Sequence, residues 1–165
     1  MRIASFFAIV FCLAGCQATP QTASQSTPHT TRPSPEAQLI ESTILWNAKV
    51  DAVTWEPIEL KKMLADKKRF TPAGNFYRSN DNITAFGHKV LYIGTLGIDL
   101  VSGPNVTLEG NPRSIAAFIA KEHNISFSEN DGEYTADIKK NIKMVVSPHP
   151  NLKNTSIVIG AYLGP

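Results

Sequence analysis

Cysteine is scarce in this chain of 165 residues, which contains only Cys12 and Cys16. Residues 17–165 therefore carry no thiol, so this part of the chain can form no disulfide and offers no thiolate ligand to zinc. A domain folded from these residues must be stabilised by its hydrophobic core.

The common catalytic and metal-binding signatures are also missing. The sequence has no HExxH, HxH or CxxC motif, and no GxSxG or SxxK motif. Because such motifs place zinc ligands or an activated serine at fixed spacings, their absence removes the zinc and serine enzymes that a sequence can identify. We predict no catalytic residue, no cofactor and no metal site.

Net charge is small where the folded domain is expected. Of the 16 Lys and Arg residues, Arg2 and Arg32 precede residue 36, so residues 36–165 carry 14 basic and 14 acidic side chains. Binding to nucleic acid depends on neutralising phosphates with a basic face. A neutral domain therefore argues against a nucleic-acid partner and against electrostatic attachment to anionic lipid.

The N-terminus has the organisation of an export signal. Residues 1–2 are Met and Arg, and residues 3–11 form an almost uninterrupted apolar run. This run is about half as long as a membrane-spanning helix requires. It leads into the sequence Leu-Ala-Gly-Cys at residues 13–16, which resembles the lipobox of bacterial lipoproteins.

The resemblance covers only the first 17 residues or so, but it implies both a modification and a location. Residues 1–15 would be a signal peptide, and the thiol of Cys16 would carry the lipid, including palmitate chains. Several acyl chains together hold a protein permanently at a membrane. Gln17, in place of Asp, implies sorting to the outer membrane of the bacterial envelope. An ordinary secretory signal with a chance cysteine is the alternative.

Two regions follow the signal. Residues 16–35 are rich in Thr, Ser, Gln and Pro and lack large apolar side chains. Such a segment buries too little surface to offset its ordering entropy, so we expect a lipidated cysteine followed by a disordered tether. Residues 36–165 have the length of one ordinary domain.

Hydrophobic spacing and turn residues predict an α+β fold, with a largely antiparallel sheet of about five to seven strands and two or three packed helices. A helix capped by Ser34 is expected to pass into a strand over residues 44–50. A second helix, capped by Thr54, would turn Leu60 and Leu64 toward the core.

The clearest helical pattern begins at Pro112, has Asn111 as its cap and ends at residues 123–124. Residues 70–82 carry loop residues, and Asp131-Gly132 is a strong hairpin signal. Strands are expected at residues 90–93, 96–101, 106–108, 125–128, 133–138, 142–146 and 156–163.

One segment has the composition of a binding surface. Arg69, Phe70, Phe76, Tyr77 and Arg78 place three aromatic rings and two guanidinium groups around a polar loop. Binding surfaces use such residues because they bring large contact areas and planar donors, and rings also stack on sugars. The alternative is that the rings pack this loop onto the sheet.

The leading hypothesis is a non-catalytic binding or assembly module, held at the membrane through lipid on Cys16, with an envelope protein or the cell wall as partner. Residues 133–138 or 156–163 would accept a partner strand if either lay at a sheet edge.

Two other functions stay open. One is a hydrolase acting on envelope material, with a site assembled from His88, His149, Asp99 and Asp137. The other is a carrier of a small ligand, which predicts a large apolar pocket between sheet and helices.

Overall fold

The computed structural model of the protein describes residues 33–51, 57–94 and 103–163. These residues form three helices and a nine-stranded sheet, so the α+β class is confirmed and the strands are more numerous than expected. The helices are α1 (Pro35–Ile44), α2 (Ile58–Leu64) and α3 (Pro112–His123). The strands are β1 (Phe70–Ala73), β2 (Phe76–Ser79), β3 (Thr84–Ala85), β4 (His88–Gly94), β5 (Asn105–Glu109), β6 (Ser128–Asn130), β7 (Glu133–Lys139), β8 (Ile142–Pro148) and β9 (Thr155–Tyr162).

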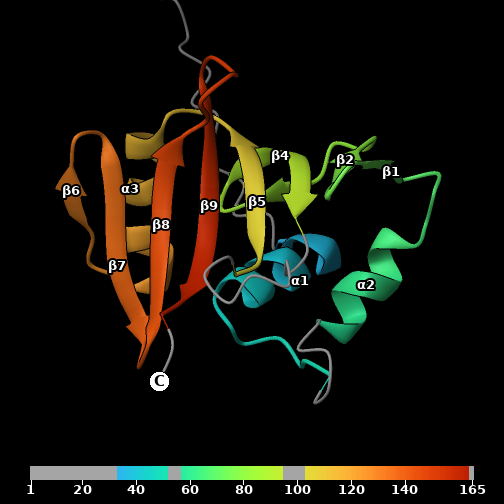
Figure 1. The fold of residues 1–165 in the computed structure, drawn as a ribbon, viewed down its shortest axis with the longest axis horizontal. Helices are drawn as coiled ribbons and strands as arrows, with labels where there is room; N and C mark the ends of the chain where they lie inside the picture. Colours follow the sequence, from blue (N-terminus) through green and yellow to red (C-terminus); the bar gives the residue numbers. More distant parts are fainter. Residues whose placement is uncertain (1–32, 52–56, 95–102, 164–165) are drawn as a thin grey trace, which may run out of the picture. The chain divides into compact units, whose positions relative to one another are not determined.

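The sheet is antiparallel at every described pairing. Its strand order is β1-β2-β4-β5-β9-β8-β7-β6, and β3 pairs with β4 beside this path. Strands β1 and β6 therefore form the two edges, far apart in Figure 1. The strands expected at residues 133–138 and 156–163 exist, but β9 lies inside the sheet and β6 covers β7 at residues 133–135. The edge pairing proposed for residues 156–163 is therefore wrong, and so is that for the first half of residues 133–138.

Helix termini follow the sequence signals closely. The Ser34 hydroxyl accepts a hydrogen bond from the Ala37 amide at 3.1 Å, and Pro35 opens α1. The Asn111 side chain caps α3 by accepting from the Ser114 amide at 2.9 Å. Asn124 ends α3 in a left-handed conformation, with φ of 53°. Each cap satisfies backbone groups that a helix end leaves without partners.

The strand expected at residues 44–50 does not form. Helix α1 ends at Ile44, and Trp46 takes a left-handed conformation with φ of 55°. The Trp46 indole N–H donates to the Gly160 carbonyl at 2.7 Å, which turns the chain back against β9. Only Val50 makes a ladder contact, as an isolated bridge to Pro57. The alternation of apolar residues therefore did not produce a strand, because the indole contact with β9 determines the backbone conformation here.

Residues 70–79 form a hairpin, β1–β2, so the loop predicted at residues 70–82 is wrong except for its last three residues. Gly74, with φ of 65°, occupies the first position of the two-residue turn. Each strand has only four residues, and Phe70 is the one fully buried side chain among them. Such short and mostly exposed strands carry too little alternation to stand out against their proline, glycine and polar residues.

Most of the remaining described elements agree with the expectations. Helix α2 buries Leu60 and Leu64, and the predicted strands and hairpin near residues 90, 106, 131, 142 and 156 are present. The strand expected at residues 125–128 is displaced: β6 begins only at Ser128 and ends at Asn130, directly before the turn, and β3 was not expected.

The cap predicted at Thr54 is wrong, because α2 begins at Ile58 with Pro57 at the N-cap position and no side-chain cap. The strand expected at residues 96–101 and the whole of residues 1–32, including Cys16, lie outside the described residues. None of the described helices is long and apolar enough to cross a membrane.

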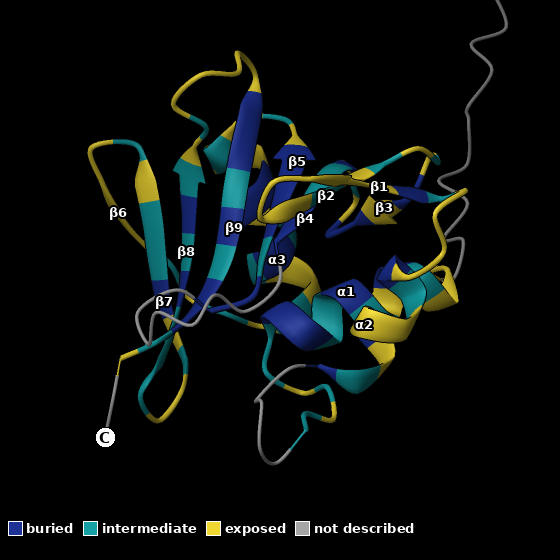
Figure 2. Ribbon diagram, turned by 45° about the vertical axis from the view of Figure 1, so that its right-hand side comes forward, coloured by how far each residue is buried: buried dark blue, intermediate teal, exposed yellow. Residues whose placement is uncertain are grey.

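One hydrophobic core joins the helices to a single face of the sheet. Helix α3 packs on β7, β8 and β9, as Figure 1 shows, and α1 contacts β3, β5 and β9. Ile115 and Ile119 of α3 are fully buried there. Figure 2 shows that α1 and the central strands contain many of the buried residues. The strand residues in this core are Phe70, Ala85, Val90, Ile93, Val106, Leu108, Met144, Val146 and Val158.

Candidate functional site

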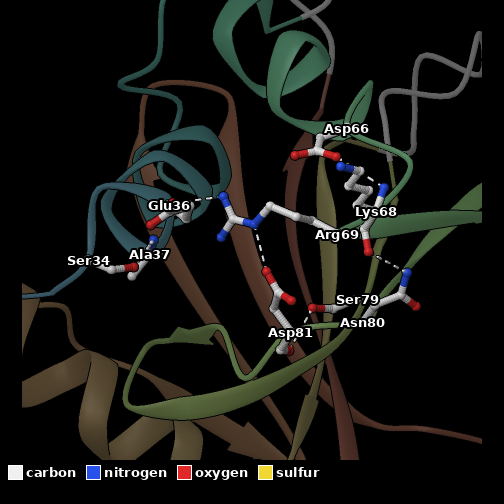
Figure 3. A network of polar contacts seen from close by, with 9 residues as sticks. All are labelled: Ser34, Glu36, Ala37, Asp66, Lys68, Arg69, Ser79, Asn80 and Asp81. Carbon is white, nitrogen blue, oxygen red and sulfur yellow. Dashed lines mark hydrogen bonds and ion pairs between the residues drawn. The ribbon is translucent and has the colours of Figure 1, made fainter.

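An arginine fixes the base of the β1–β2 hairpin. Arg69 Nε lies 2.6 Å from Asp81 Oδ2, and Arg69 Nη1 lies 2.9 Å from Glu36 Oε1 (Figure 3). Glu36 belongs to the first turn of α1, Arg69 directly precedes β1, and Asp81 follows β2. The two ion pairs therefore fasten the hairpin to the start of α1.

The charges in this cluster stabilise one another. A hydrogen bond to its own backbone amide, followed by the one from Arg69, lowers the pKa of Glu36 below its ordinary value. Hydrogen bonds to Asp81 and then to Glu36 raise the pKa of Arg69. Because the Arg69 side chain is 34% exposed, water screens these pairs in part.

Further hydrogen bonds brace the same base (Figure 3). The Asn80 side chain donates to the Lys68 carbonyl at 3.2 Å, and the Asn80 amide donates to the Arg69 carbonyl at 2.8 Å. The Lys68 amide donates to Asp66 Oδ1 at 3.0 Å. These hydrogen bonds and the two ion pairs of Arg69 together hold the residues on either side of the hairpin in place.

The five residues predicted to form a binding surface do not all face solvent. Phe70 is 0% exposed and Tyr77 packs against the core, so Phe70 is not available to a partner and that part of the predicted surface is wrong. The guanidinium of Arg69 is paired with Glu36 and Asp81. Phe76 is 42% exposed, and Arg78 is exposed too.

Phe76 and Arg78 project from the same face because alternate residues of a strand do so. Arg78 pairs across the ladder with Thr71 on one side and with Tyr92 on the other. Directly paired residues share a face, so Tyr92 of β4 extends this surface. We call Phe76, Arg78 and Tyr92 the hairpin face.

The outer edge of the hairpin is closed to strand addition. Residues that flank a two-residue turn hydrogen-bond each other, and bonded pairs then alternate along the strands. Thr71 and Ala73 therefore bond to β2, while Phe70 and Pro72 point their backbone groups outward. The Phe70 amide donates to the Asp66 carbonyl at 2.9 Å, and Pro72 has no amide hydrogen. Strand β1 consequently offers no free amide donor.

The histidines proposed for a hydrolytic site make structural contacts. His88 Nδ1 lies 3.0 Å from the Glu109 carbonyl oxygen. His149 Nδ1 accepts hydrogen bonds from the amides of Asn151 and Leu152, both at 3.1 Å, and so shapes the β8–β9 loop.

The acidic candidates do not join these histidines. Asp137 is exposed on β7 and pairs across the ladder with Lys143, near the start of β8. His149 directly follows the end of β8, about 20 Å away at the usual rise per residue. Asp99 lies outside the described residues. Among the described residues, no group of three His, Cys, Asp or Glu side chains is arranged to hold a metal ion.

A partly buried carboxylate that the sequence did not single out joins three elements. Glu41 of α1 accepts the Phe86 amide at 2.6 Å, in the turn between β3 and β4, and lies 3.8 Å from His123 Nε2 at the end of α3. Phe86 is fully buried although its φ is 50°. Glu41 therefore holds the backbone of a turn that a bulky residue seldom adopts.

A hollow of about 490 Å³ lies between the start of α3 and the β8–β9 loop. Prolines and amide side chains make up much of its wall. It is not the pocket between sheet and helices that the carrier hypothesis predicts. Its lining residues are Asn111, Pro112, Pro148, His149, Pro150, Asn151, Leu152, Lys153, Asn154 and Thr155.

Comparisons with protein-family models, with curated proteins and with solved structures found no match. The candidate site is therefore identified from the geometry of this structure alone.

Proposed function

We propose that this protein is a lipid-anchored envelope lipoprotein whose domain binds a partner, without catalysis, through the hairpin face of Phe76, Arg78 and Tyr92. The lipobox resemblance at residues 13–16 supports the anchor. The chemistry and exposure of the hairpin face support the binding role.

The exposure of Phe76 is the observation that carries the binding role. An aromatic ring that stays 42% exposed buries little apolar surface on folding, so it contributes little to the stability of its own domain. It stands on a hairpin whose base is fixed by two ion pairs, so little further ordering is needed when a partner covers it. An exposed guanidinium beside one exposed and one half-buried aromatic ring has the composition found at the centres of protein interfaces.

The closed edge of β1 restricts how a partner can bind here. With no free amide donor on β1, recognition must use the side chains of the hairpin face. Aromatic rings and a guanidinium suit a protein surface that has an apolar pocket and an acidic rim, and rings also suit the flat faces of sugars. An envelope protein is the partner we favour, and a cell-wall glycan is the other outcome of the test.

Capture of the partner from cells tests this proposal. Phe76→Ala combined with Arg78→Ala should lower the amount of partner crosslinked to the protein by about tenfold or more, as loss of interface anchors does. Leu152→Ala is the matched control, because Leu152 is 39% exposed but lies in the β8–β9 loop. Equal capture by the double variant and the wild type would refute the binding role of the hairpin face.

The anchor is tested separately. Cys16→Ser should abolish incorporation of labelled fatty acid and move the protein from the membrane to the soluble fraction. Gln17→Asp should keep the lipid but alter sorting between the two membranes. Membrane attachment of the Cys16→Ser protein would contradict the lipoprotein proposal without bearing on the hairpin face.

A further inference from the structure

The second edge of the sheet, strand β6, differs from β1 because its backbone is open. Its three residues are all exposed, and it pairs only with β7. The turn between the two strands is Asp131-Gly132, with φ of 49° and 80°. Two positive φ values identify a two-residue turn of the type that fixes hairpin register.

This register directs one residue outward. Asn130 and Glu133 flank the turn and hydrogen-bond each other, so Ser128 bonds in the same way to Thr135. Glu129 lies between these pairs, and its N–H and C=O therefore point away from β7. Neither group has a hydrogen-bond partner among the described residues.

The side chains around this edge are acidic. Residues 124–135 contain Glu129, Asp131 and Glu133 but no Lys or Arg. All three carboxylates belong to exposed residues. Natural sheet edges are often protected by lysine or proline, and β6 has neither.

A second copy of the chain does not suit this edge. A twofold axis that paired β6 with β6 around Glu129 would place two Glu129 side chains directly opposite each other. Like charges in that position destabilise an antiparallel pair. The same charges favour a strand that carries Lys or Arg.

We infer that β6 is a docking edge for an extended basic segment of a protein partner, which adds to the sheet as a further strand. The Glu129 N–H and C=O would form a pair of backbone hydrogen bonds with that segment. The surrounding carboxylates would contact its basic side chains. This inference depends neither on the lipid anchor nor on the hairpin face.

The test uses the full chain in detergent micelles and two synthetic peptides, one of alternating Lys and Thr and one of alternating Glu and Thr. The Lys peptide should bind, the Glu peptide should not, and binding should weaken as salt rises. On binding, exchange of the Glu129 amide hydrogen should slow, while the amides of β1 should not change. Absence of binding, equal binding of both peptides, or unchanged exchange at Glu129 would overturn the inference.

Two variants separate the backbone contribution from the charge. Glu129→Gln removes one charge and keeps the amide hydrogen, whereas Glu129→Pro removes both. Proline is tolerated at an edge position whose amide points outward, so the melting temperature should change little. Loss of the donor should make binding of Glu129→Pro about tenfold weaker than that of Glu129→Gln. Equal binding by the two variants would show attraction by charge alone and would contradict strand addition.

The variant pair Phe76→Ala and Arg78→Ala separates this inference from the proposed function. These substitutions should leave binding of the Lys peptide unchanged, because the hairpin face lies at the other end of the sheet. Failure of partner capture and failure of peptide binding are therefore distinguishable.

Discussion

Arg69, which precedes β1, and Asp81, which follows β2, join the two strands at the open end of the hairpin, with Nε and Oδ2 only 2.6 Å apart. The same guanidinium reaches Glu36 at 2.9 Å, so one side chain couples the hairpin to the start of α1. The hairpin joins the rest of the sheet only through the β2–β4 ladder, so these ion pairs attach it to the domain at a second place.

Arg69→Met should destabilise the domain by about 1–2 kcal/mol, because it removes the cation between two carboxylates in a partly buried position. Urea unfolding measures this change. Lys62→Met is the control, since Lys62 pairs with Glu59 at the surface and both side chains are more than half exposed. Its cost should be at most about 0.5 kcal/mol. Equal costs for the two substitutions would contradict the structural role of Arg69.

Acid should weaken the same cluster. The pKa of Glu36 is lowered from its ordinary value of 4.5 in the folded protein, so the unfolded chain binds a proton more readily. The contribution of Glu36 to stability is therefore fully present above about pH 5 and is lost as the pH falls through the lowered pKa. Unfolding free energies from pH 6 to pH 3 should fall less steeply for Glu36→Gln than for the wild type. Parallel curves would contradict this linkage.

The two phenylalanines of the hairpin should behave in opposite ways. Phe70→Ala removes a fully buried ring and should cost about 3–5 kcal/mol. Phe76→Ala removes a ring that is 42% exposed and should cost less than about 1 kcal/mol. Thermal or urea unfolding distinguishes them. A large loss for Phe76→Ala would mean that the ring stabilises the fold, and the case for a binding ring would be lost.

The cap of α3 offers an independent check on the local structure. Asn111→Ala should cost about 1 kcal/mol, because the Ser114 amide loses its acceptor. Asn111→Asp keeps an acceptor and adds a negative charge at the helix N-terminus, so stability should be unchanged or slightly higher. Equal losses for both substitutions would show that the cap is not used.

Elements with strong local signals could be predicted from the sequence. Asn111 and Pro112 define the start of α3, and Asp131-Gly132 defines the β6–β7 turn, because these residues act on the backbone within a few positions. The predictions failed where distant contacts decide the conformation. Trp46 ends the first helix segment through a bond to Gly160, which lies 114 positions further along the chain.

The candidate site was predicted in part. The aromatic and arginine composition of residues 69–78 directed attention to the right segment, yet it could not tell an inward ring from an outward one. Gly74-Asn75 was the missed signal, since glycine at the first position of a two-residue turn indicates a hairpin. With the hairpin assigned, alternation would have placed Phe70 and Phe76 on opposite faces. The ion pairs of Arg69 join it to Glu36, 33 positions away, and to Asp81, 12 positions away, and had no local signature.

Photocrosslinking in living cells tests the central claim most directly. Benzoylphenylalanine placed at position 76 of the full chain, in place of Phe76, should yield one reproducible adduct in the membrane fraction, and Arg78→Ala in the same chain should reduce it. The same probe in place of Leu152 should not yield that adduct. No adduct from position 76, or the same adducts from both positions, would contradict a partner-binding role for the hairpin face.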